Sequence, residues 1–316
     1  MAFFHIRHLT HYLYTGKVVD SANQIKLYPV RDDRQRVTEH TVEISQNPAV
    51  HVIHDYFGNK TGFFTLIHPH SELYIENRMA VEIVNTPLAT LQSATEVWQH
   101  LQQPETQLLY HPFLKAEQAK MQQEIHDVVQ QWVSFQDHPL ESIARLSDFI
   151  YQHFTYKKGV TTIETRVDEL WKLKAGVCQD FAHLLLYMLR LVNIPCRYIS
   201  GYICPGSSEW RGEGATHAWA EAWMPDTGWV GIDPTNKCLA GERHVRLANG
   251  RNFSDCTPVK GTYRGAVEHL LEVTVQFSTT PFTERQRAEQ APTFVNRVNT
   301  EGMPQNSYTT YLQMQQ

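Results

Sequence analysis

The sequence predicts an α+β fold, in which helices pack on an antiparallel sheet and a small antiparallel β-domain precedes them. Three observations support this class. Apolar and polar residues alternate up to about residue 88, helical spacing then continues to residue 192, and alternation returns over residues 196–235. A period of 2 is typical of half-buried strands and a period near 3.6 of amphipathic helices. The chain therefore reads as strands, then helices, then strands.

Length and charge limit the number of domains and the kinds of partner that we expect. A chain of 316 residues has room for two domains and can bury a sizeable core without disulfides. The formal net charge is −5, from 28 basic and 33 acidic residues that are interspersed along the chain. Because no basic stripe is present to neutralise a phosphate backbone, we expect no nucleic-acid partner.

The first residues, MAFFHIRH, lack a charged leader followed by an apolar run. No apolar stretch approaches the ~20 residues that span a bilayer. The sequence therefore predicts a cytoplasmic protein without membrane contact. Five cysteines do not make a disulfide framework, and the absence of a C-x-x-C pair argues against structural zinc, so we expect neither metal nor cofactor.

Residues 1–88 are expected to form the β-domain, with segments such as Thr41–Ser45 alternating as half-buried strands do. His5, His8 and His11 lie close together in this region. On a strand, His8 points away from the other two. This favours ordinary structural roles for the three histidines over a shared metal site.

The next region, residues 89–265, is assigned to the core domain. Two amphipathic helices are predicted there, with a shorter one over residues 94–102. From Cys178 to Val192 nearly every residue is a good helix former and the segment is apolar on most sides, which predicts a buried central helix. The apolar residues of the two amphipathic helices are Ile125, Val128, Val129 and Trp132, and then Ile143, Leu146, Ile150 and Phe154.

The carboxyl-terminal third is predicted to end the core and return to the β-domain. Residues 243–262 are polar and contain glycine, so we expect a long surface loop beside the site. Residues 270–277 alternate as a final strand, within a segment 266–280 that would return to the β-domain. Residues 281–316, rich in Gln, Thr, Asn and Arg, are expected to form a loosely ordered polar tail.

Three residues of the core carry the chemistry of nucleophilic catalysis. Cys178 opens the central helix, His217 lies on a later strand and Asp233 on the strand after it. A thiol must ionise before it attacks a carbonyl, and both a helix amino terminus and a histidinium partner favour the thiolate. The alternative is that Cys178 is a small buried hydrophobe, as most free cysteines are.

The strand pattern makes a testable statement about His217 and Asp233. Paired residues in an antiparallel hairpin have a constant index sum, and only an even sum places these two side chains on one face. We therefore predict a loop of three or five residues around Pro225–Gly228. A loop of two or four residues would turn Asp233 to the opposite face.

With that geometry, Cys178 attacks an amide or ester carbonyl, His217 moves the proton and Asp233 orients the imidazole. The oxyanion would be held by the Cys178 backbone N–H and a second donor, for which Trp171 and Gln179 are candidates. Further assignments are open: Asp255 as a competing carboxylate, Glu221 as one too distant along its strand, Asp180 as a structural residue of the helix start, Tyr202 and Arg251 as substrate-side groups, and Trp219, Trp223 and Trp229 as cleft walls or core.

Four motifs resemble those of the transglutaminase-like superfamily. They are Gly176-x-Cys178-x-Asp180-Phe181-Ala182, Ile194-Pro195-x-Arg197-Tyr198-x-x-Gly201-Tyr202, His217-Ala218-Trp219-x-Glu221 and Gly228-Trp229-x-x-x-Asp233-Pro234-Thr235. More narrowly, residues 1 to about 277 resemble bacterial members that have a β-rich amino-terminal domain and are often described as candidate cysteine proteases. The resemblance implies a papain-like, transglutaminase-like core with a Cys-His-Asp triad.

The resemblance leaves the reaction open, because superfamily members cross-link glutamine to amines, hydrolyse peptide or amide bonds, or remove glycans from asparagine, and some have lost catalysis. Our leading hypothesis is a thiol hydrolase or acyltransferase acting on a peptide or protein substrate, with hydrolysis favoured because water is the default acceptor. The second hypothesis is a non-catalytic binding module that uses the cleft and the β-domain. A metalloenzyme, suggested only by the 17 histidines, is a distant third.

Overall fold

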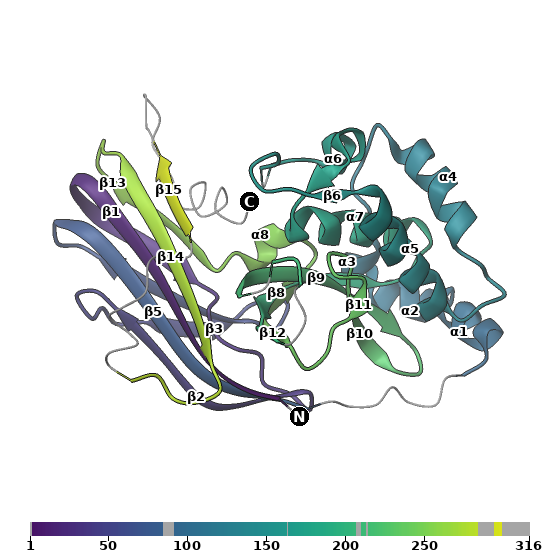
Figure 1. Cartoon of the computed structure of the whole chain (residues 1–316), viewed down its shortest axis with the longest axis horizontal. Coiled ribbons are helices and arrows are strands. Elements are labelled where there is room, and N and C mark those ends of the chain that lie inside the picture. Colours follow the sequence, from purple (N-terminus) through teal and green to yellow (C-terminus); the bar gives the residue numbers. More distant parts are fainter. Residues whose placement is uncertain are drawn as a thin grey trace.

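The computed structural model describes residues 2–84, 92–162, 164–206, 210–212 and 214–283 in full, and residues 294–298 as backbone. Two parts lie side by side: a β-domain of long strands, and a core in which a five-stranded sheet is covered by helices (Figure 1). This is the predicted α+β arrangement. Among the residues described, no helix combines the length and the apolar character needed to cross a membrane.

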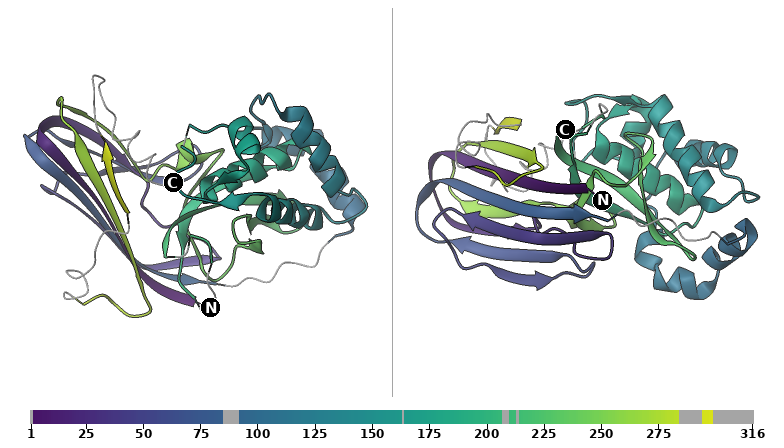
Figure 2. Two further views of the ribbon diagram at one scale, coloured as in Figure 1. Left: turned by 45° about the horizontal axis from the view of Figure 1, so that its top comes forward. Right: turned by 60° about the horizontal axis from the view of Figure 1, so that its bottom comes forward.

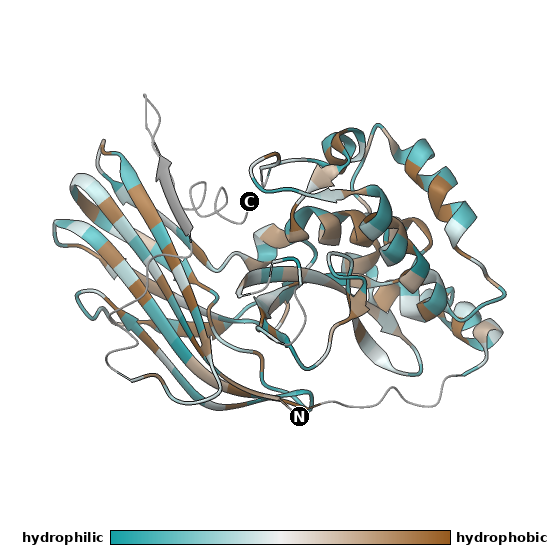
Figure 3. Cartoon of the chain, in the orientation of Figure 1, coloured by the Kyte–Doolittle hydropathy of each residue, from teal (hydrophilic) through white to brown (hydrophobic). Residues whose placement is uncertain are grey.

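The β-domain is an eight-stranded sheet built around its first strand. Its strands are β1 (Ala2–Ile25), β2 (Gln35–Ile44), β3 (His51–His54), β4 (Lys60–Leu66), β5 (His70–Ile83), β13 (Val259–Arg264), β14 (His269–Ser278) and β15 (Phe294–Val298). The first half of β1 lies between β5 and β14, and its second half between β4 and β13. Hydrophilic and hydrophobic bands alternate along these strands, as the period of 2 predicts (Figure 3).

The β-domain therefore takes three strands from the chain that follows the core. β14 pairs with β1 from His5–Ser278 to Tyr14–His269. The polar tail expected over residues 281–316 is wrong at residues 294–298, which form β15 on the edge of β14. A sheet edge presents unpaired backbone groups, so a short alternating segment can add there even when the surrounding composition is polar. The rest of the expected tail lies outside the described residues, apart from residues 281–283.

The core sheet has the order β11-β10-β9-β8-β12, and all of its pairs are antiparallel. Its strands are β8 (Cys196–Ile203), β9 (Ala215–Met224), β10 (Gly228–Asp233), β11 (Cys238–Leu239) and β12 (His244–Gly250). The central helix α7 (Cys178–Leu191) packs on this sheet and is buried along most of its length, as predicted. The sheet lies between the helices and the β-domain (Figure 2).

The remaining helices lie around α7 and the core sheet, and the two that contain Phe113 and Asp255 contact the β-domain. They are α1 (Ala94–Leu101), α2 (Pro104–Leu109), α3 (His111–Leu114), α4 (Gln122–Trp132), α5 (Pro139–His153), α6 (Val167–Leu173) and α8 (Phe253–Cys256). Two short strands, β6 (Thr155–Tyr156) and β7 (Ala175–Gly176), pair in parallel. This pairing places Tyr156 next to Gly176, just before the start of α7. Tyr156 is therefore near the candidate site.

The surface loop predicted over residues 243–262 is wrong. This segment forms β12, α8 and the start of β13, and β12 is paired with β8 inside the molecule. Two of its polar residues, Arg246 and Asn249, contact the β-domain, whereas others, such as Arg251 and Lys260, are exposed. Arg246 donates to both carboxylate oxygens of Asp32 at 2.6 and 2.7 Å, and Asn249 exchanges hydrogen bonds with Asn59 at 2.7 and 2.8 Å. Part of the polarity of the segment therefore reflects an interface between the two parts.

Candidate active site

Cys178 is the first residue of α7, and the turn that leads to it is held by Asp180. The Asp180 carboxylate accepts from the Val177 N–H at 2.8 Å and from the Thr161 hydroxyl at 2.7 Å. Burial raises the pKa of Asp180 to about 6, against the effect of these two hydrogen bonds. A Cβ on Gly176 would lie 2.6 Å from the Asp180 carboxylate, so only glycine fits there. The contacts of Asp180 are those of a structural residue that fixes the start of α7.

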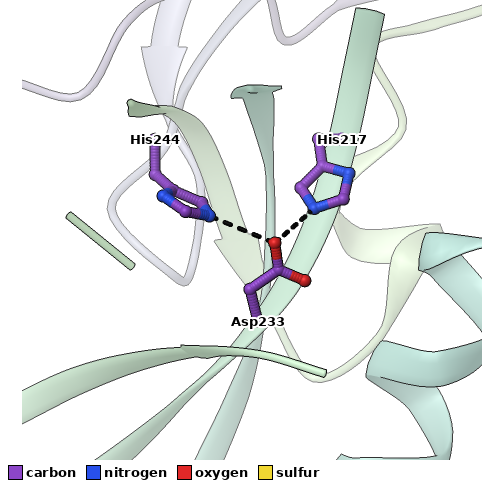
Figure 4. A group of neighbouring side chains, drawn as sticks. All are labelled: His217, Asp233 and His244. Carbon is purple, nitrogen blue, oxygen red and sulfur yellow. Dashed lines mark hydrogen bonds and ion pairs between the residues drawn. The ribbon is translucent and has the colours of Figure 1, made fainter. Parts of the chain in front are cut away.

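His217 and Asp233 lie on one face because of the hairpin that joins β9 to β10. Met224 pairs with Gly228 and Trp223 with Trp229, so the loop contains residues 225–227. The predicted odd loop is thereby confirmed at three residues. The His217 Nε2–H donates to Asp233 Oδ2 at 2.8 Å, and both side chains have no exposed area (Figure 4).

The electrostatics of this pair favour a charged imidazole. Burial alone lowers the pKa of His217, but the Asp233 carboxylate and the neighbouring Cys178 thiol outweigh burial and raise it well above the usual range. Burial would raise the pKa of Asp233, and His217 and His244 hold it far below its usual value instead. The arrangement is therefore an imidazolium paired with a carboxylate in a dry environment.

The second ring nitrogen of His217 is directed to the nucleophile side. Nδ1 is buried and has no hydrogen-bond partner among the residues described, while Nε2 is engaged by Asp233. Cys178 is among the groups that raise the pKa of His217. The two residues are buried, at 5 % and 2 % exposure. The structure brings together the three residues that the sequence predicts, Cys178, His217 and Asp233. They come from three separate elements, α7, β9 and β10.

Asp233 has further partners that the sequence did not indicate. His244 Nε2 lies 3.2 Å from Asp233 Oδ2, and Asn236 donates to the same oxygen at 2.8 Å. Oδ1 accepts from the Thr235 N–H at 2.9 Å. His244 was missed because it opens β12, within the segment read as a loop. Its sequence signal is the short alternation that follows it, in which Val245 and Leu247 are apolar and Arg246 is polar.

The ligand atoms of His217, Asp233 and His244 all lie within 4.8 Å of one another, a spacing that a metal ion can occupy. The hydrogen bonds do not fit that use. The Gly241 N–H donates to His244 Nδ1 at 3.2 Å, so the proton of a neutral His244 resides on Nε2 and points to Asp233. A metal-binding histidine usually donates its second N–H outward instead. The cluster is a hydrogen-bonded carboxylate with a histidine on each side (Figure 4).

Tyr156 is a second functional candidate that the sequence did not indicate. A Cβ on Gly212 would lie 3.2 Å from His217 Nδ1 and 3.4 Å from the Tyr156 hydroxyl, so the hydroxyl and Nδ1 border the same space. Burial, and then the neighbouring Cys178 and Asp233, raise the pKa of Tyr156, so that its O–H remains a donor. Gly212 has a φ of +74°, and its lack of a Cβ keeps this space open.

The two predicted oxyanion donors differ in outcome. Trp171 is wrong as a donor, because its indole N–H donates to Glu124 at 3.2 Å and its ring lies under the Lys174 ammonium in the helical layer. An indole that packs among α4, α5 and α6 cannot reach the thiol side of α7. Gln179 is buried in the first turn beside Cys178, and its carboxamide oxygen has no partner among the described residues. It stays a candidate.

Two of the predicted substrate-side groups, Tyr202 and Trp219, are buried residues of the core sheet. Tyr202 is fully buried, with its hydroxyl 2.7 Å from His8 Nδ1 at the contact with the β-domain, so it cannot touch substrate. Trp219 is also fully buried, stacked near the His217 ring and edge-on to His244, and forms the wall behind the imidazole. For both residues the alternation of β8 and β9 places them on a covered face.

Arg251 lies at a different cavity, which has a volume of about 830 Å³ and does not include Cys178 in its lining. Its Nε donates to Asp255 at 3.3 Å, which also removes Asp255 as the competing partner of His217. Glu221 is paired with Arg197 at 2.6 Å, so it too is not the orienting carboxylate. None of the triad residues lines this cavity, so the chemistry of the triad lies elsewhere.

A helix that begins with a cysteine, packed on an antiparallel sheet that supplies a histidine and an aspartate, defines the transglutaminase-like class of core. Residues 126–234 match the transglutaminase-like superfamily and residues 4–82 match the bacterial transglutaminase-like N-terminal region. The chain belongs to this superfamily and has its bacterial form of amino-terminal domain.

Known proteins agree with this assignment. An uncharacterized protein of Mycobacterium tuberculosis is 32 % identical over 296 residues, which cover 86 % of this chain and 91 % of that protein. A protein-glutamine gamma-glutamyltransferase of Pseudomonas aeruginosa is 33 % identical over 107 residues, 32 % of this chain and 16 % of that one. The solved structure of a candidate cysteine protease from Cytophaga hutchinsonii has a TM-score of 0.70, with 17 % identity, over 96 % of this chain and 92 % of that chain. This last similarity concerns the fold.

Proposed function

We propose that the protein is a thiol-dependent hydrolase or acyltransferase that acts on peptide or amide bonds through an acyl-enzyme at Cys178. The observation that carries the proposal is the buried His217–Asp233 pair, whose remaining ring nitrogen is unpartnered on the side of the Cys178 thiol. A nucleophile, a base and an orienting carboxylate in this order are the parts that covalent acyl transfer requires.

In the proposed reaction, His217 Nδ1 holds the proton that the Cys178 thiol has given up, and the thiolate attacks the substrate carbonyl carbon. The resulting oxyanion accepts hydrogen bonds from the Cys178 backbone N–H and the Tyr156 hydroxyl. His217 then returns its proton to the leaving amine, the C–N bond breaks and the acyl group stays on sulfur. Water attacks the thioester with His217 as base, which releases a carboxylic acid and restores the thiol.

Hydrolysis is proposed over cross-linking, because water needs no binding site of its own. The Pseudomonas aeruginosa relative, a protein-glutamine gamma-glutamyltransferase, supports an amide as the acyl donor for a core of this type. The acceptor is tested by supplying a primary amine, such as a labelled cadaverine, with a glutamine-containing protein such as casein. Release of acid without amine incorporation supports hydrolysis, whereas incorporation that depends on Cys178 indicates acyl transfer to amines. The cytoplasmic location stays a prediction that cell fractionation tests.

One observation favours the alternative of a non-catalytic binding module. Cys178 and His217 are nearly inaccessible, at 5 % and 2 % exposure, so a substrate needs some opening of the site. A binding module would keep the same fold without thiol reactivity.

The reactivity of Cys178 separates the two functions. The alkylation rate of each cysteine by iodoacetamide would be measured from pH 5 to 9 and mapped by mass spectrometry, in wild type and in His217→Ala. We expect Cys178 to react selectively, to remain reactive below pH 7, and to lose that low-pH reactivity in the variant. An inert Cys178, or one whose rate rises as for an ordinary thiol in both proteins, would favour the binding module. The other four cysteines, Cys196, Cys204, Cys238 and Cys256, serve as internal controls.

A further inference from the structure

We infer that His244 is a positioning residue of the proposed active site: as a neutral donor on the side opposite His217, it holds the Asp233 carboxylate in place. This inference rests on the proposed function and adds a fourth residue to it. His244 touches neither the thiol nor, in the proposed reaction, the substrate, so it acts through Asp233.

The tautomer of His244 is determined by its surroundings. The Gly241 N–H donates to Nδ1 at 3.2 Å, which makes Nδ1 the acceptor and Nε2 the protonated nitrogen. Nε2 lies 3.2 Å from Asp233 Oδ2 and can only donate there. A charged His244 would carry a proton on Nδ1 as well, facing the Gly241 N–H donor to donor. The backbone therefore selects the neutral ring.

The electrostatic surroundings agree with a neutral ring. The pKa of His244 is lowered, first by burial and also by the positive charges of His217 and Arg243, although Asp233 acts in the opposite direction. His244 is 4 % exposed. Its ring lies edge-on to the ring of Trp219, with 5.0 Å between the ring centroids, and the ring centroid of Trp210 is 5.7 Å away. These aromatic neighbours fix the plane in which Nε2–H is aimed.

The position of His244 in the fold gives it a role that Thr235 and Asn236, the partners next to Asp233 in the sequence, do not have. Thr235 and Asn236 belong to the turn that directly follows Asp233, so they move with it. His244 comes from β12, where it pairs with Ile203 of β8. It therefore ties the end of β10 to a separate strand. Because the donor is uncharged, it restrains the carboxylate and leaves its negative charge available to His217.

The test uses two variants of the full-length protein. In His244→Gln, the carboxamide nitrogen takes about the place of Nε2 and can donate to Asp233. In His244→Asn, the shorter side chain keeps a polar group near Gly241 but does not reach the carboxylate. The second-order rate of Cys178 alkylation is measured from pH 5 to 9, alongside wild type and His217→Ala.

For each protein, the alkylation rate at pH 6 is divided by the rate at pH 9. We expect this ratio to be roughly tenfold or more lower in His244→Asn than in wild type, since a hydrogen bond to a charged group is lost. His244→Gln should stay within about threefold of wild type. If His244→Asn keeps the wild-type profile, or if both variants lose it equally while remaining folded, the inference is wrong. If wild type itself lacks low-pH reactivity, the proposed function fails, which is a separate outcome.

A measurement on the wild-type protein keeps the inference testable if the variants do not fold. A long-range proton–nitrogen spectrum of histidine-labelled protein reports which ring nitrogen carries the proton. We expect a neutral His244 with its proton on Nε2 between pH 6 and 8. A proton on Nδ1, or a charged ring in that range, would overturn the inference.

Discussion

Tyr156 is the neutral donor that borders the space between His217 Nδ1 and Gly212. Iodoacetamide alkylation forms no oxyanion, whereas turnover of an ester does. Tyr156→Phe should therefore leave Cys178 alkylation unchanged and lower the turnover of p-nitrophenyl acetate by roughly 10 to 100-fold, as expected for loss of one oxyanion donor. Burst and steady-state rates would be measured together.

Tyr74→Phe is the matched control, because Tyr74 is a partly exposed residue of β5 in the β-domain. It should change neither rate. An equal loss of alkylation and ester turnover in Tyr156→Phe would assign the hydroxyl to the support of the triad, and not to the oxyanion.

Asp180 makes the stability of the protein depend on pH. Its folded pKa of about 6 lies above the value near 3.9 expected in the unfolded chain. The folded protein therefore holds a proton that the unfolded chain has lost, and stability from this group falls as the pH rises from about 4 to 6. Asp180→Asn keeps an acceptor for the Val177 N–H and removes this dependence. Wild type should lose up to about 3 kcal/mol relative to the variant between pH 4 and 7.

Urea unfolding at pH steps of half a unit measures this difference. Asp127→Asn provides the same chemical change at an exposed position of α4. It should run parallel to wild type across the range. A constant difference between Asp180→Asn and wild type would contradict the raised pKa.

The β9–β10 hairpin decides whether its two catalytic candidates meet. With three loop residues the index sum is even, and Asp233 shares a face with His217. If the hairpin keeps a loop of three residues, one glycine inserted after Asp226 moves Asp233 by one position and turns it to the opposite face, and two inserted glycines return it to the face of His217. We expect the single insertion to lower Cys178 alkylation at pH 6 at least tenfold more than the double insertion, as when an oriented group is displaced.

The double insertion is the control for loop length, because it disturbs the loop more while keeping the face. Equal rates in the two insertion variants would mean that the loop, or a bulge in the ladder, takes up the extra residue and that the strand register is kept. In that case the pairing of β9 with β10, and not the length of the loop, brings Asp233 to His217.

Periodicity predicted the elements whose partners are near in sequence. The helices α4, α5 and α7 and the strands β8 to β10 lie where their apolar spacing placed them, and the hairpin parity followed from counting. β12 was missed because its polar residues, Arg246 and Asn249, contact side chains some 190 to 214 positions away. A single segment does not reveal whether its polar groups meet water or another strand.

The residues of the candidate site also fall into two groups, those that the sequence indicated and those that it did not. Cys178, His217 and Asp233 were indicated by residue type and motif, whereas His244 and Tyr156 depend on how β12 and β6 return to the site. Tyr202 was misassigned because a tyrosine on a strand near the motifs can face either layer, and here it faces His8. The positions of His244, Tyr156 and Tyr202 depend on pairing between segments that are distant in the sequence.

The contact between the two parts contains buried polar groups. Replacing Tyr202 with phenylalanine removes the partner of His8 Nδ1 and leaves a buried polar atom unpaired, at a cost of about 1–3 kcal/mol in the free energy of unfolding. Because the Tyr202 side chain faces the β-domain, on the opposite face of the core sheet from His217, the pH profile of Cys178 alkylation should not change. Chemical denaturation and the alkylation assay measure the two effects.

Tyr56→Phe is the control, since Tyr56 is 79 % exposed in the β-domain. It should alter stability by less than about 0.5 kcal/mol. An altered alkylation profile in Tyr202→Phe would instead show that the contact with the β-domain influences the site.

The pairing of β1 with β13 and β14 has a consequence for synthesis. Residues 2–25 leave the ribosome long before residues 259–278, which complete the other side of the strand. At 5–20 residues per second, translation of the intervening chain takes about 12 to 47 s. During that time one edge of β1 is open to pairing with other chains. The whole core is synthesised after the first strands of the β-domain and before the last ones. Translation speed and chaperone supply should therefore affect the yield of this protein more than its final stability does.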